Sequence, residues 1–498
     1  MTRERYESLS LTALKDIAKA RNIKGTSLMK KAELIDSMMA LDEKEASRAA
    51  AAPEETDENV QTPAKKKDIP SDSSNSDNSE NVPSHGKGKG DSAKHQNPVK
   101  EENASLEDKK NGSENELAED KKVLDSGEEA RGILEVMPDG FGFIRSDNYL
   151  PGPDDVYVAP SQIRRFGLKT GDIIVGNTRV KSPNDKFGAL LFVRTINGLT
   201  PEEASKRKNF EDLTPVFPNE KLKLEIPGGS IAMRIMDLMC PVGKGQRGMI
   251  VSPPKAGKTT LLKDVAKSIT VNNPEMHLII LLIDERPEEV TDIKESIISD
   301  QVEVIYSTFD ELPEHHKRVS EMVIERAKRL VEQGEDVIIL LDSITRLTRA
   351  YNLTVQPSGR TLSGGLDPAA LHMPKRFFGA ARNMREGGSL TILATALIDT
   401  GSKMDDVVYE EFKGTGHMDM VLDRKLSEKR VFPAIDIPKS GTRRDDLLIE
   451  KYDLDAVNLM RKAFNGLKPD EAVEKCLDHF VHTRNNVEFV EMIKKIRL

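Results

Sequence analysis

The sequence contains no tryptophan and only two cysteines among its 498 residues. Cys240 and Cys476 are too few for a disulfide framework and too far apart in sequence to predict a metal-ligand pair by spacing. This usage favours a reducing compartment, and we expect a cytoplasmic protein. The longest apolar runs, 278–283 and 337–341, fall far below the roughly 18 residues of a membrane span, and no signal peptide is visible. We therefore expect no membrane association.

Aromatic residues are also scarce, at 4% of the chain against 32% charged residues. Residues 46–128 contain none at all and combine 12 basic with 19 acidic side chains. Such a segment cannot bury enough apolar surface to offset chain entropy, so we expect a disordered acidic linker. Because this segment holds most of the net charge of −9, the overall acidity does not exclude a nucleic-acid partner.

The segment before the linker, residues 1–45, is predicted to be a small helical unit. Its apolar residues recur at helical spacing in two runs separated by Gly25 and Thr26. Its basic residues form either a nucleic-acid face or an ordinary solvated surface, and the pattern leaves both open.

The segments after the linker predict two further domains. Residues 129–205 contain five short β-rich runs separated by turn residues, which predicts an all-β barrel of the OB type. After a connector at 206–235, apolar strands alternate with amphipathic helices over 236–498, which predicts an α/β doubly wound parallel sheet with C-terminal helices. One of these helices is expected to bury Val319, Met322, Val323, Ala327, Leu330 and Val331.

A phosphate-binding loop follows the first strand of the α/β domain. The nonapeptide SPPKAGKTT, residues 252–260, stands between the strand GMIV and a helical run. Backbone N–H groups at such a helix N-terminus cradle phosphates, Lys258 reaches the β- and γ-phosphates, and the Thr259 hydroxyl ligates Mg²⁺. Ser252 stands where the general pattern has glycine, so the nonapeptide alone is also compatible with a turn that exposes a lysine. We expect ATP and Mg²⁺ as ligands.

Two more strands end in carboxylates at the same expected sheet edge. DVIILLD ends in Asp342, the position from which a carboxylate holds Mg²⁺, and LIILLID leads into Glu285 and Arg286. Ligands of open α/β sheets bind at this edge, where a carboxylate can orient and deprotonate the attacking water. Glu285 is therefore the candidate base. The alternative for Glu285 and Arg286 is a helix cap with a surface salt bridge.

Phosphoryl transfer also needs positive charge opposite the γ-phosphate, and near the loop only Lys258 obviously supplies it. Arg430, Arg443 and Arg444 lie far along the chain and could act from a neighbouring subunit. Ordinary surface solvation is the alternative for all three, and the pattern alone favours it.

An aromatic strand lies near the start of the predicted barrel. Phe141 and Phe143 alternate with glycine, so both rings share one face, and Tyr157 follows. Exposed rings on such a strand stack on unpaired bases while Arg145 meets phosphate, as in cold-shock and OB domains. The alternative is that the rings fill the barrel core. Stacking by itself does not separate RNA from DNA.

Two flexible segments, 356–365 and 401–403, each surround one basic residue, Arg360 and Lys403. They are either loops that touch a strand in a pore or mobile surface loops.

These motifs resemble the family of bacterial transcription termination factor Rho, a hexameric ring helicase. The resemblance runs from about residue 131 to the C-terminus, and we extend it to the first 45 residues. It is carried by DGFGFIRS, GPDDVYV, SQIRRF, GKGQRG, PPKAGKTTLL, LLIDERPEEVTD, VIILLDSITRLTRAYN, LHMPKRFFGAARN, ALIDTGSKMD, YEEFKGTG and EKRVFPAIDIPKSGTRR.

The resemblance implies a RecA-type motor, an RNA-binding OB domain and ATP-driven 5′ to 3′ translocation on nascent RNA that ends transcription. It implies a homohexamer with RNA polymerase and elongation factors as partners. It makes Glu285 the water-activating residue, Asp342 the Mg²⁺ carboxylate and Arg443 the arginine supplied by the adjacent subunit. The implied nucleotide-contacting positions are Gly243, Lys244, Gly245, Gln246, Arg247, Gly248, Lys255, Ala256, Gly257, Lys258, Thr259, Thr260, Arg286, Asp342 and Arg430.

The resemblance also implies two RNA sites. The primary site comprises Gly140, Phe141, Gly142, Phe143, Ile144, Arg145, Asp155, Val156, Tyr157, Asp185, Lys186 and Phe187. The secondary site, in the central pore, comprises Arg360, Thr361, Leu362, Ser363, Gly364, Gly365 and Lys403.

Rho proteins lack the first glycine of the phosphate-loop pattern, which accounts for Ser252. Three features depart from the family pattern. In SPNDKFGALL, residues 182–191, the aromatic residue is shifted, which leaves the third RNA contact open. Arg360 stands where lysine is usual, and the acidic linker has no counterpart in compact members. We predict an RNA-dependent ATPase. The rivals are a rotary-type ATPase subunit, which would lack the aromatic strand, and a passive RNA-binding regulator that uses ATP only to assemble.

Overall fold

The structure is a computed structural model that describes residues 124–182, 185–464 and 466–495, with a few positions between 30 and 39. The chain divides into two units, residues 1–99 and 100–498, and the second is described below. The predicted helical unit and the predicted linker up to residue 123 lie outside the described residues, those few positions excepted. The expected linker end at residue 128 is wrong, because the first strand already begins at Asp125 and Ser126 donates to the Thr178 carbonyl on a neighbouring strand.

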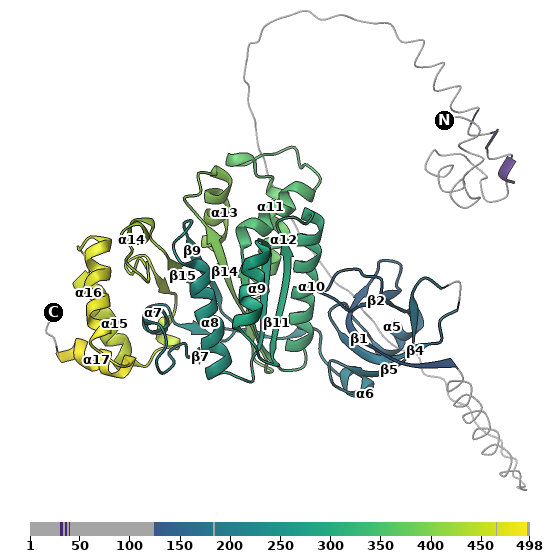
Figure 1. Ribbon diagram of the computed structural model, residues 1–498, viewed down its shortest axis with the longest axis horizontal. Coiled ribbons are helices and arrows are strands. Elements are labelled where there is room, and N and C mark those ends of the chain that lie inside the picture. Colours follow the sequence, from purple (N-terminus) through teal and green to yellow (C-terminus); the bar gives the residue numbers. More distant parts are fainter. Residues whose placement is uncertain are drawn as a thin grey trace, which may run out of the picture. The chain divides into compact units, whose positions relative to one another are not determined.

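The predicted small barrel is present as a closed five-stranded barrel (Figure 1). Its strand order is β1-β2-β3-β5-β4, and a short helix, α5, connects β3 to β4. Inward-pointing residues such as Leu134, Ile144 and Val158 make a core of their own. The bounds are β1 Asp125–Val136, β2 Gly142–Arg145, β3 Val156–Val158, α5 Pro160–Phe166, β4 Ile173–Arg179 and β5 Gly188–Ile196.

The second domain is built on the predicted parallel sheet, with the strand order β11-β10-β12-β14-β9-β15-β16. All of these pairs are parallel except β15 with β16. The short strand β13 lies off this order and pairs antiparallel with both β14 and β6. The bounds are β6 Pro215–Val216, β9 Arg247–Ser252, β10 His277–Glu285, β11 Val302–Thr308, β12 Asp336–Asp342, β13 Arg382–Met384, β14 Ser389–Leu397, β15 Met418–Val421 and β16 Gly441–Thr442.

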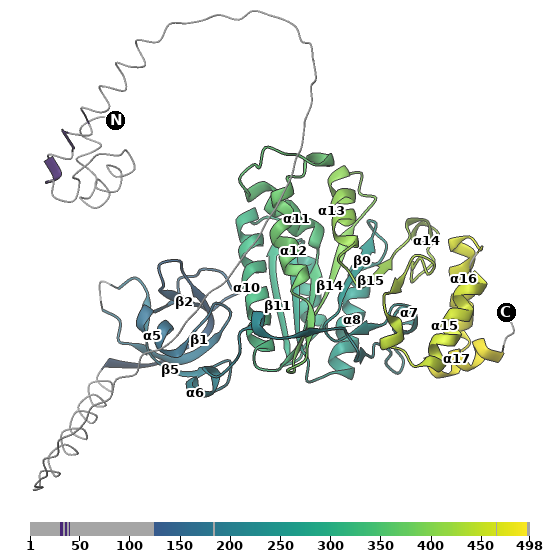
Figure 2. The same cartoon turned by 180° about the vertical axis from the view of Figure 1, so that it is seen from behind.

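Helices cover both faces of the sheet, as Figures 1 and 2 show from opposite sides. In β10, Ile280 and Leu282 join the core beneath α8 and α9, whereas Ile279 and Leu281 join the core beneath α10 and α11. A strand buried on both faces explains why LIILLI is an unbroken apolar run. The six residues expected on one helix face are all buried on α10. The sheet helices are α8 Lys258–Asn272, α9 Pro287–Ser296, α10 Pro313–Val331, α11 Ile344–Thr354, α12 His372–Gly379 and α13 Lys403–Lys413.

Shorter elements and C-terminal helices complete the domain. The expected connector end at residue 235 falls inside α7, which Ser230 caps and which is buried in the core of the parallel-sheet domain. These elements are α6 Pro201–Ala204, η1 Phe210–Asp212, β7 Lys221–Leu222, α7 Ile231–Met239, β8 Val242–Gly243, η2 Ser363–Gly365, η3 Pro368–Leu371, α14 Arg424–Glu428, η4 Asp445–Leu447, α15 Lys451–Phe464, α16 Pro469–Val481 and α17 Asn486–Lys495. None of the described helices is long and apolar enough to cross a bilayer.

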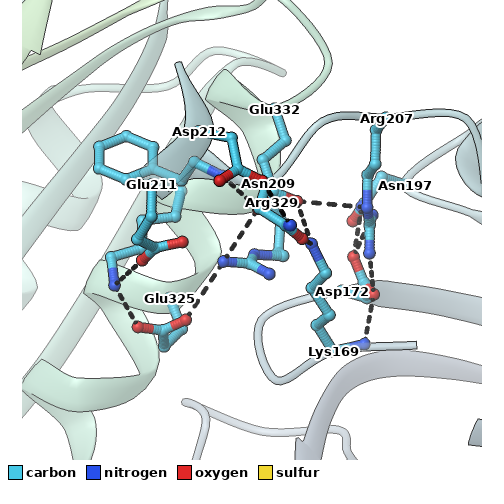
Figure 3. A network of polar contacts seen from close by, with 12 residues as sticks. Lys169, Asp172, Asn197, Arg207, Asn209, Glu211, Asp212, Glu325, Arg329 and Glu332 are labelled. Atoms are coloured by element: carbon cyan, nitrogen blue, oxygen red, sulfur yellow. Dashed lines mark hydrogen bonds and ion pairs between the residues drawn. The ribbon is translucent and has the colours of Figure 1, made fainter. Parts of the chain in front are cut away.

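A buried ionic clamp fastens the barrel to the C-terminal end of α10 (Figure 3). The side chain of Glu332 has no exposed surface and accepts from Lys169 Nζ at 3.2 Å and Arg207 Nε at 3.2 Å. Arg207 also forms a two-bond pair with the fully buried Asp172 of the barrel, at 2.5 and 2.6 Å. Gly171 lets the barrel backbone approach this closely, since its φ is +94° and an added Cβ would lie 2.4 Å from the α10 backbone.

The barrel also covers the free edge of the sheet. The Asn148 side chain donates to the Tyr306 carbonyl at 2.7 Å and accepts from the Tyr306 N–H at 3.1 Å. It therefore pairs with the edge strand β11 in the way a further strand would, which protects that edge.

Candidate functional site

The phosphate loop links β9 to α8 at the carboxyl edge of the sheet. Lys255 and Gly257 both adopt left-handed backbone angles, with φ of 63° and 91°. This turn directs the unpaired N–H groups of the first turn of α8 toward the loop, where they favour an anion. Sequence and structure therefore agree on the position of the loop.

Lys258, Glu285 and Asp342 meet at this edge, because β9, β10 and β12 all end there. Lys258 Nζ lies 2.8 Å from Glu285 Oε1 and 2.6 Å from Asp342 Oδ1. Thr395 on β14 donates to the same Asp342 oxygen at 2.7 Å. The two carboxylates are 3% and 1% exposed, so they are held in a water-poor site with one shared cation.

Burial and charge shift the protonation of this cluster. Burial, reinforced by the charge of Asp342, raises the pKa of the Glu285 carboxyl. Burial opposes the charge on Lys258, but the two carboxylates outweigh it and raise the pKa of the Lys258 amine. A carboxylate with a raised pKa is a better proton acceptor, which suits a general base.

Two neighbours of Glu285 extend the cluster. Arg346 Nη1 at the start of α11 lies 3.3 Å from Glu285 Oε2. Arg286, predicted to contact nucleotide, is exposed at the start of α9 and makes no ion pair with any residue that the structure describes. The salt-bridge alternative for Arg286 is therefore absent within those residues.

The oxygen donors near the loop fit Mg²⁺. Thr259 Oγ1 is on the first turn of α8 and donates to Glu289 Oε2 at 3.2 Å, while Asp342 stands at the end of β12. The described part of the chain has no cluster of three or more side chains able to cage a metal by themselves. This set is typical of Mg²⁺, which takes one or two protein oxygens together with substrate phosphates.

Phe432 is a candidate contact that the sequence reasoning missed. Its side chain is 49% exposed, and its ring lies 3.8 Å from the position of a Cβ built on Gly257. An exposed ring beside a phosphate loop is suited to stacking on a nucleobase. Arg430, which was predicted, is exposed two residues earlier in the chain. The sequence signal for Phe432 was weak, because a single phenylalanine before a proline belongs to no periodic pattern.

The predicted residues 243–248 lie at the opposite end of β9. The strand runs from Arg247 to Ser252, so about 16 Å separate its ends. Lys244 is paired with Asp336, the first residue of β12, at 2.9 Å. Arg247 donates to the Ala381 carbonyl at 2.8 Å. Within one chain these six residues are therefore kept away from the phosphate loop, and nucleotide contact by them stays a prediction.

Arg443 lies at this same far end. Its N–H donates to the His417 carbonyl at 2.7 Å, and His417 Nε2 lies 2.8 Å from Arg247 Nη2. A cavity of about 200 Å³ opens here, and it is lined by Phe217, Pro218, Gln246, His417, Arg443, Arg444 and Leu448. The structure thus gathers Gln246 and Arg443 in one place, but not with Lys258 of the same chain.

The aromatic residues of the barrel form a cluster outside its core. Phe143 pairs directly with Tyr157 across the β2–β3 ladder, and their ring centres are 6.0 Å apart. Phe141 lies 5.8 Å from Phe143, and Phe187 lies 5.2 Å from it. All four rings are only half-buried, whereas the alternate residue Ile144 is 2% exposed and fills the core. The core-filling alternative is therefore wrong.

A groove of about 770 Å³ runs beside these rings. It is lined by Phe143, Tyr157, Phe187, Asp185 and Lys186, all predicted for the primary site, and by Arg179 and Gln162. Gly142 is needed beside the rings, because a Cβ there would lie 2.9 Å from the Glu135 carbonyl oxygen.

Arg145, which was predicted to meet phosphate beside the rings, is buried and paired in this structure. Its side chain is 5% exposed and is ion-paired with both Asp155 and Glu135. The guanidinium packs 4.8 Å from the centre of the Phe143 ring. Its burial follows from the register, since Arg145 lies opposite Ile133, which is buried against the parallel-sheet domain. Two carboxylates therefore occupy the Arg145 guanidinium in this structure, and phosphate contact by Arg145 stays a prediction.

The two predicted pore loops touch each other. Arg360, Thr361 and Lys403 are exposed. Gly364 has a φ of 77°, and a Cβ there would lie 2.5 Å from the Met404 nitrogen. The loop that carries Arg360 therefore rests on the start of α13, beside Lys403.

Sequence comparison finds close relatives over most of the chain. A transcription termination factor Rho of Pseudomonas aeruginosa is 56% identical over 382 residues, which cover 75% of this chain and 90% of that protein. Those of Bacillus subtilis and Aquifex aeolicus are 57% and 53% identical over 365 residues each, covering 73% and 72% of this chain and 84% of either protein. The chain belongs to the Rho transcription termination factor family.

Two domain families agree with membership of the Rho family. The Rho termination factor RNA-binding domain matches residues 130–202, the barrel. The nucleotide-binding domain of the ATP synthase alpha/beta family matches residues 232–442, the parallel-sheet domain. Among solved structures, an ATPase from the type III secretion system of pathogenic bacteria aligns with a TM-score of 0.49 and 21% identity, over 64% of this chain and 94% of that chain.

Proposed function

We propose that this chain binds single-stranded RNA on its barrel, hydrolyses ATP at its phosphate loop, and uses the two activities to terminate transcription. The single observation that carries the proposal is that one Rho-family chain holds both sites. The aromatic cluster lies outside the barrel core, and the buried Lys258, Glu285 and Asp342 cluster lies at the sheet edge.

The geometry supports a defined chemistry at the phosphate loop. The α8 N-terminus binds the phosphates, and Lys258 exchanges its carboxylate partners for the β- and γ-phosphates. Glu285 accepts the proton of the attacking water. Thr259 and Asp342 would hold Mg²⁺, which neutralises phosphate charge when bound. Phe432 stacks on the base.

The separation of the two ends of β9 supports a ring of subunits. Arg443 and residues 243–248 cannot reach the phosphate loop of their own chain, yet a second copy brings its far end to that loop when subunits pack head to tail. Arg443 then supplies the positive charge that Lys258 alone does not. We propose a homohexamer in which hydrolysis takes place between subunits.

The same proposal assigns the RNA path. The barrel rings capture unpaired bases, and the paired loops around Arg360 and Lys403 contact the strand inside the ring. Movement from 5′ to 3′ along nascent RNA, with RNA polymerase and elongation factors as partners, rests on membership of the Rho family.

The proposal is tested by Lys258→Ala. This variant loses the ammonium that binds the phosphates, so RNA-stimulated phosphate release should fall by at least about a hundredfold, in the range of other electrostatic groups that stabilise a transition state. RNA capture, measured by fluorescence anisotropy, should stay within about twofold because Lys258 is remote from the barrel. Unchanged turnover would remove the motor activity from the proposal.

Homopolymers separate this proposal from its rivals. ATP hydrolysis measured with single-stranded RNA and DNA homopolymers should rise with RNA. Hydrolysis that ignores every polymer favours a rotary-type ATPase, and RNA binding without any turnover favours a passive regulator.

A further inference from the structure

The barrel face that carries the aromatic strand also contacts the parallel-sheet domain, which is called the motor domain below. Glu135 lies opposite Phe143 on the β1–β2 ladder. Two residues along, Ile133 lies opposite Arg145, so these side chains share one face. Ile133 is buried in the core cluster of α10, whereas Phe143 belongs to the ring cluster. A single sheet face thus reaches from the rings to the motor.

A chain of ion pairs joins the two ends of this face. Glu135 Oε2 accepts from Arg145 Nε at 2.8 Å and from Arg145 Nη2 at 2.7 Å. The same oxygen accepts from Nη2 of Arg318, on α10, at 2.6 Å. Glu135 is 15% exposed and Arg145 is 5% exposed, so water screens these contacts weakly. One carboxylate oxygen is therefore shared between a barrel arginine and a motor arginine.

The sharing is uneven. Arg318 Nε is buried and has no hydrogen-bond partner in the part of the chain that the structure describes. A guanidinium holds a carboxylate best through two parallel N–H bonds. Glu135 would satisfy this donor by turning from Arg145 toward Arg318. The same three side chains therefore have a second arrangement, which favours Arg318.

The loop that leads into α10 is bonded to β10, the strand that ends in Glu285, and the first turn of α10 is bonded to β11. Phe309 N–H, just before the helix, donates to the Glu285 carbonyl at 3.1 Å. On the first turn, His316 Nδ1 lies 2.7 Å from Ser307 Oγ at the end of β11. Arg318 is on the second turn of α10. A shift of Arg318 can thus reach the backbone of Glu285 through the start of α10 and the loop before it.

The far end of α10 is held in place. Glu332 there is completely buried, and Lys169, Arg207 and Arg329 surround it (Figure 3). Breaking such a buried cluster leaves uncompensated charge, so it acts as a fixed point. Arg318, which is 34% exposed, belongs to the attachment that can rearrange.

We propose that Arg318 is a positioning residue that reports RNA on the aromatic strand to the catalytic end of α10, through Glu135. A base stacked on Phe143 brings phosphate close to Arg145, because that guanidinium lies 4.8 Å from the ring centre. Arg145 then holds Glu135 less firmly, and Glu135 turns to Arg318. The inference rests on the proposed RNA-dependent hydrolysis.

The test uses the full chain with Arg318→Gln and Arg318→Lys. Arg194→Gln is the matched control, since Arg194 pairs with Glu129 on the barrel surface at 2.6 Å and, among the residues that the structure describes, forms no ion pair with the motor domain. Binding of a fluorescent single-stranded RNA of about six nucleotides reports the barrel site. Phosphate release titrated with long single-stranded RNA reports coupling.

Arg318→Gln should bind the short RNA within about twofold of the unaltered chain, whereas its RNA stimulation of hydrolysis falls about fivefold or more. Arg318→Lys should be intermediate, because it keeps the charge and loses the fork. Hydrogen exchange should show RNA-dependent protection of residues 309–318 in the unaltered chain and none in Arg318→Gln.

Three outcomes overturn the proposal. Arg318→Gln that matches Arg194→Gln in every assay shows that the contact carries nothing. Equal losses of RNA binding and of stimulation show that Arg318 only orders the strand. If the unaltered chain binds RNA but its ATP hydrolysis is not stimulated, the proposed function fails as well. Failure of the proposed function can therefore be told apart from failure of the Arg318 proposal alone.

Discussion

At the scale of single residues, the raised pKa of Glu285 predicts the pH dependence of hydrolysis. A base works only when it is ionised, so kcat/KM for ATP should fall as the pH drops through the raised pKa of Glu285. This limb should lie above the ordinary glutamate value of about 4.3. Arg346 lowers this pKa, so Arg346→Gln should move the limb to higher pH. The pH dependence of kcat/KM is measured at saturating RNA. An acidic limb that does not move in Arg346→Gln contradicts Glu285 as the base.

A second residue, His417, predicts a pH dependence of stability. Burial, aided by the charges of Arg247 and Arg443, lowers the pKa of His417 to about 4. The unfolded chain, with a pKa of about 6.5, binds the proton more readily. The contribution of His417 to the free energy of unfolding is therefore fully present above pH 6.5 and is lost as the pH drops toward about 4.

Solvent screening reduces this effect, so the free energy of unfolding should lose about 1 kcal/mol through His417 near pH 5. Urea unfolding near pH 7 and near pH 5 measures it, and His417→Asn should lack this part of the slope. An identical slope in that variant would show that other groups produce it.

At the scale of elements, the β2–β3 ladder predicts a separation of binding from stability. Phe143→Ala with Tyr157→Ala should weaken single-strand RNA binding by roughly 1 to 3 kcal/mol for each base that loses its ring. The melting temperature of the barrel should change little, because both rings lie outside its core. Val158→Ala, a fully buried neighbour, is the control and should do the reverse. Unfolding of the double variant would place the rings in the core after all.

The elements differ in how well their sequences predict them. β10, β12 and β14 are buried on both faces and read as unbroken apolar runs, so the sequence predicts them directly. β11 was not predicted, because Glu303 interrupts a half-buried edge strand. Tertiary contacts account for Glu303, whose carboxylate bonds His277 of β10 at 2.5 Å, pairs with Arg326 of α10 and accepts from the Tyr149 hydroxyl of the barrel.

At the scale of the whole molecule, opposite placement of Lys258 and Arg443 predicts complementation between subunits. A mixture of Lys258→Ala and Arg443→Ala chains creates some interfaces that hold both side chains and others that hold neither. RNA-stimulated hydrolysis should therefore recover in mixed rings, although each variant alone is inactive. Each variant mixed with itself is the control, and complete failure to recover would contradict catalysis between subunits.

The sequence by itself determined the order of the barrel and the parallel-sheet domain, the sheet edge and the position of the phosphate loop. These depend on local order: strands buried on both faces are continuously apolar, and a loop between strand and helix carries its own signature. It also placed the rings on one face, because side chains alternate along a strand.

Tertiary structure alone decided which residues from different segments contact one another. It paired Arg145 with Glu135 and Asp155, brought Phe432 to Gly257, and placed Arg443 at the far end of β9. These contacts join segments tens to hundreds of residues apart. Their energies depend on burial and on partners that no local pattern records.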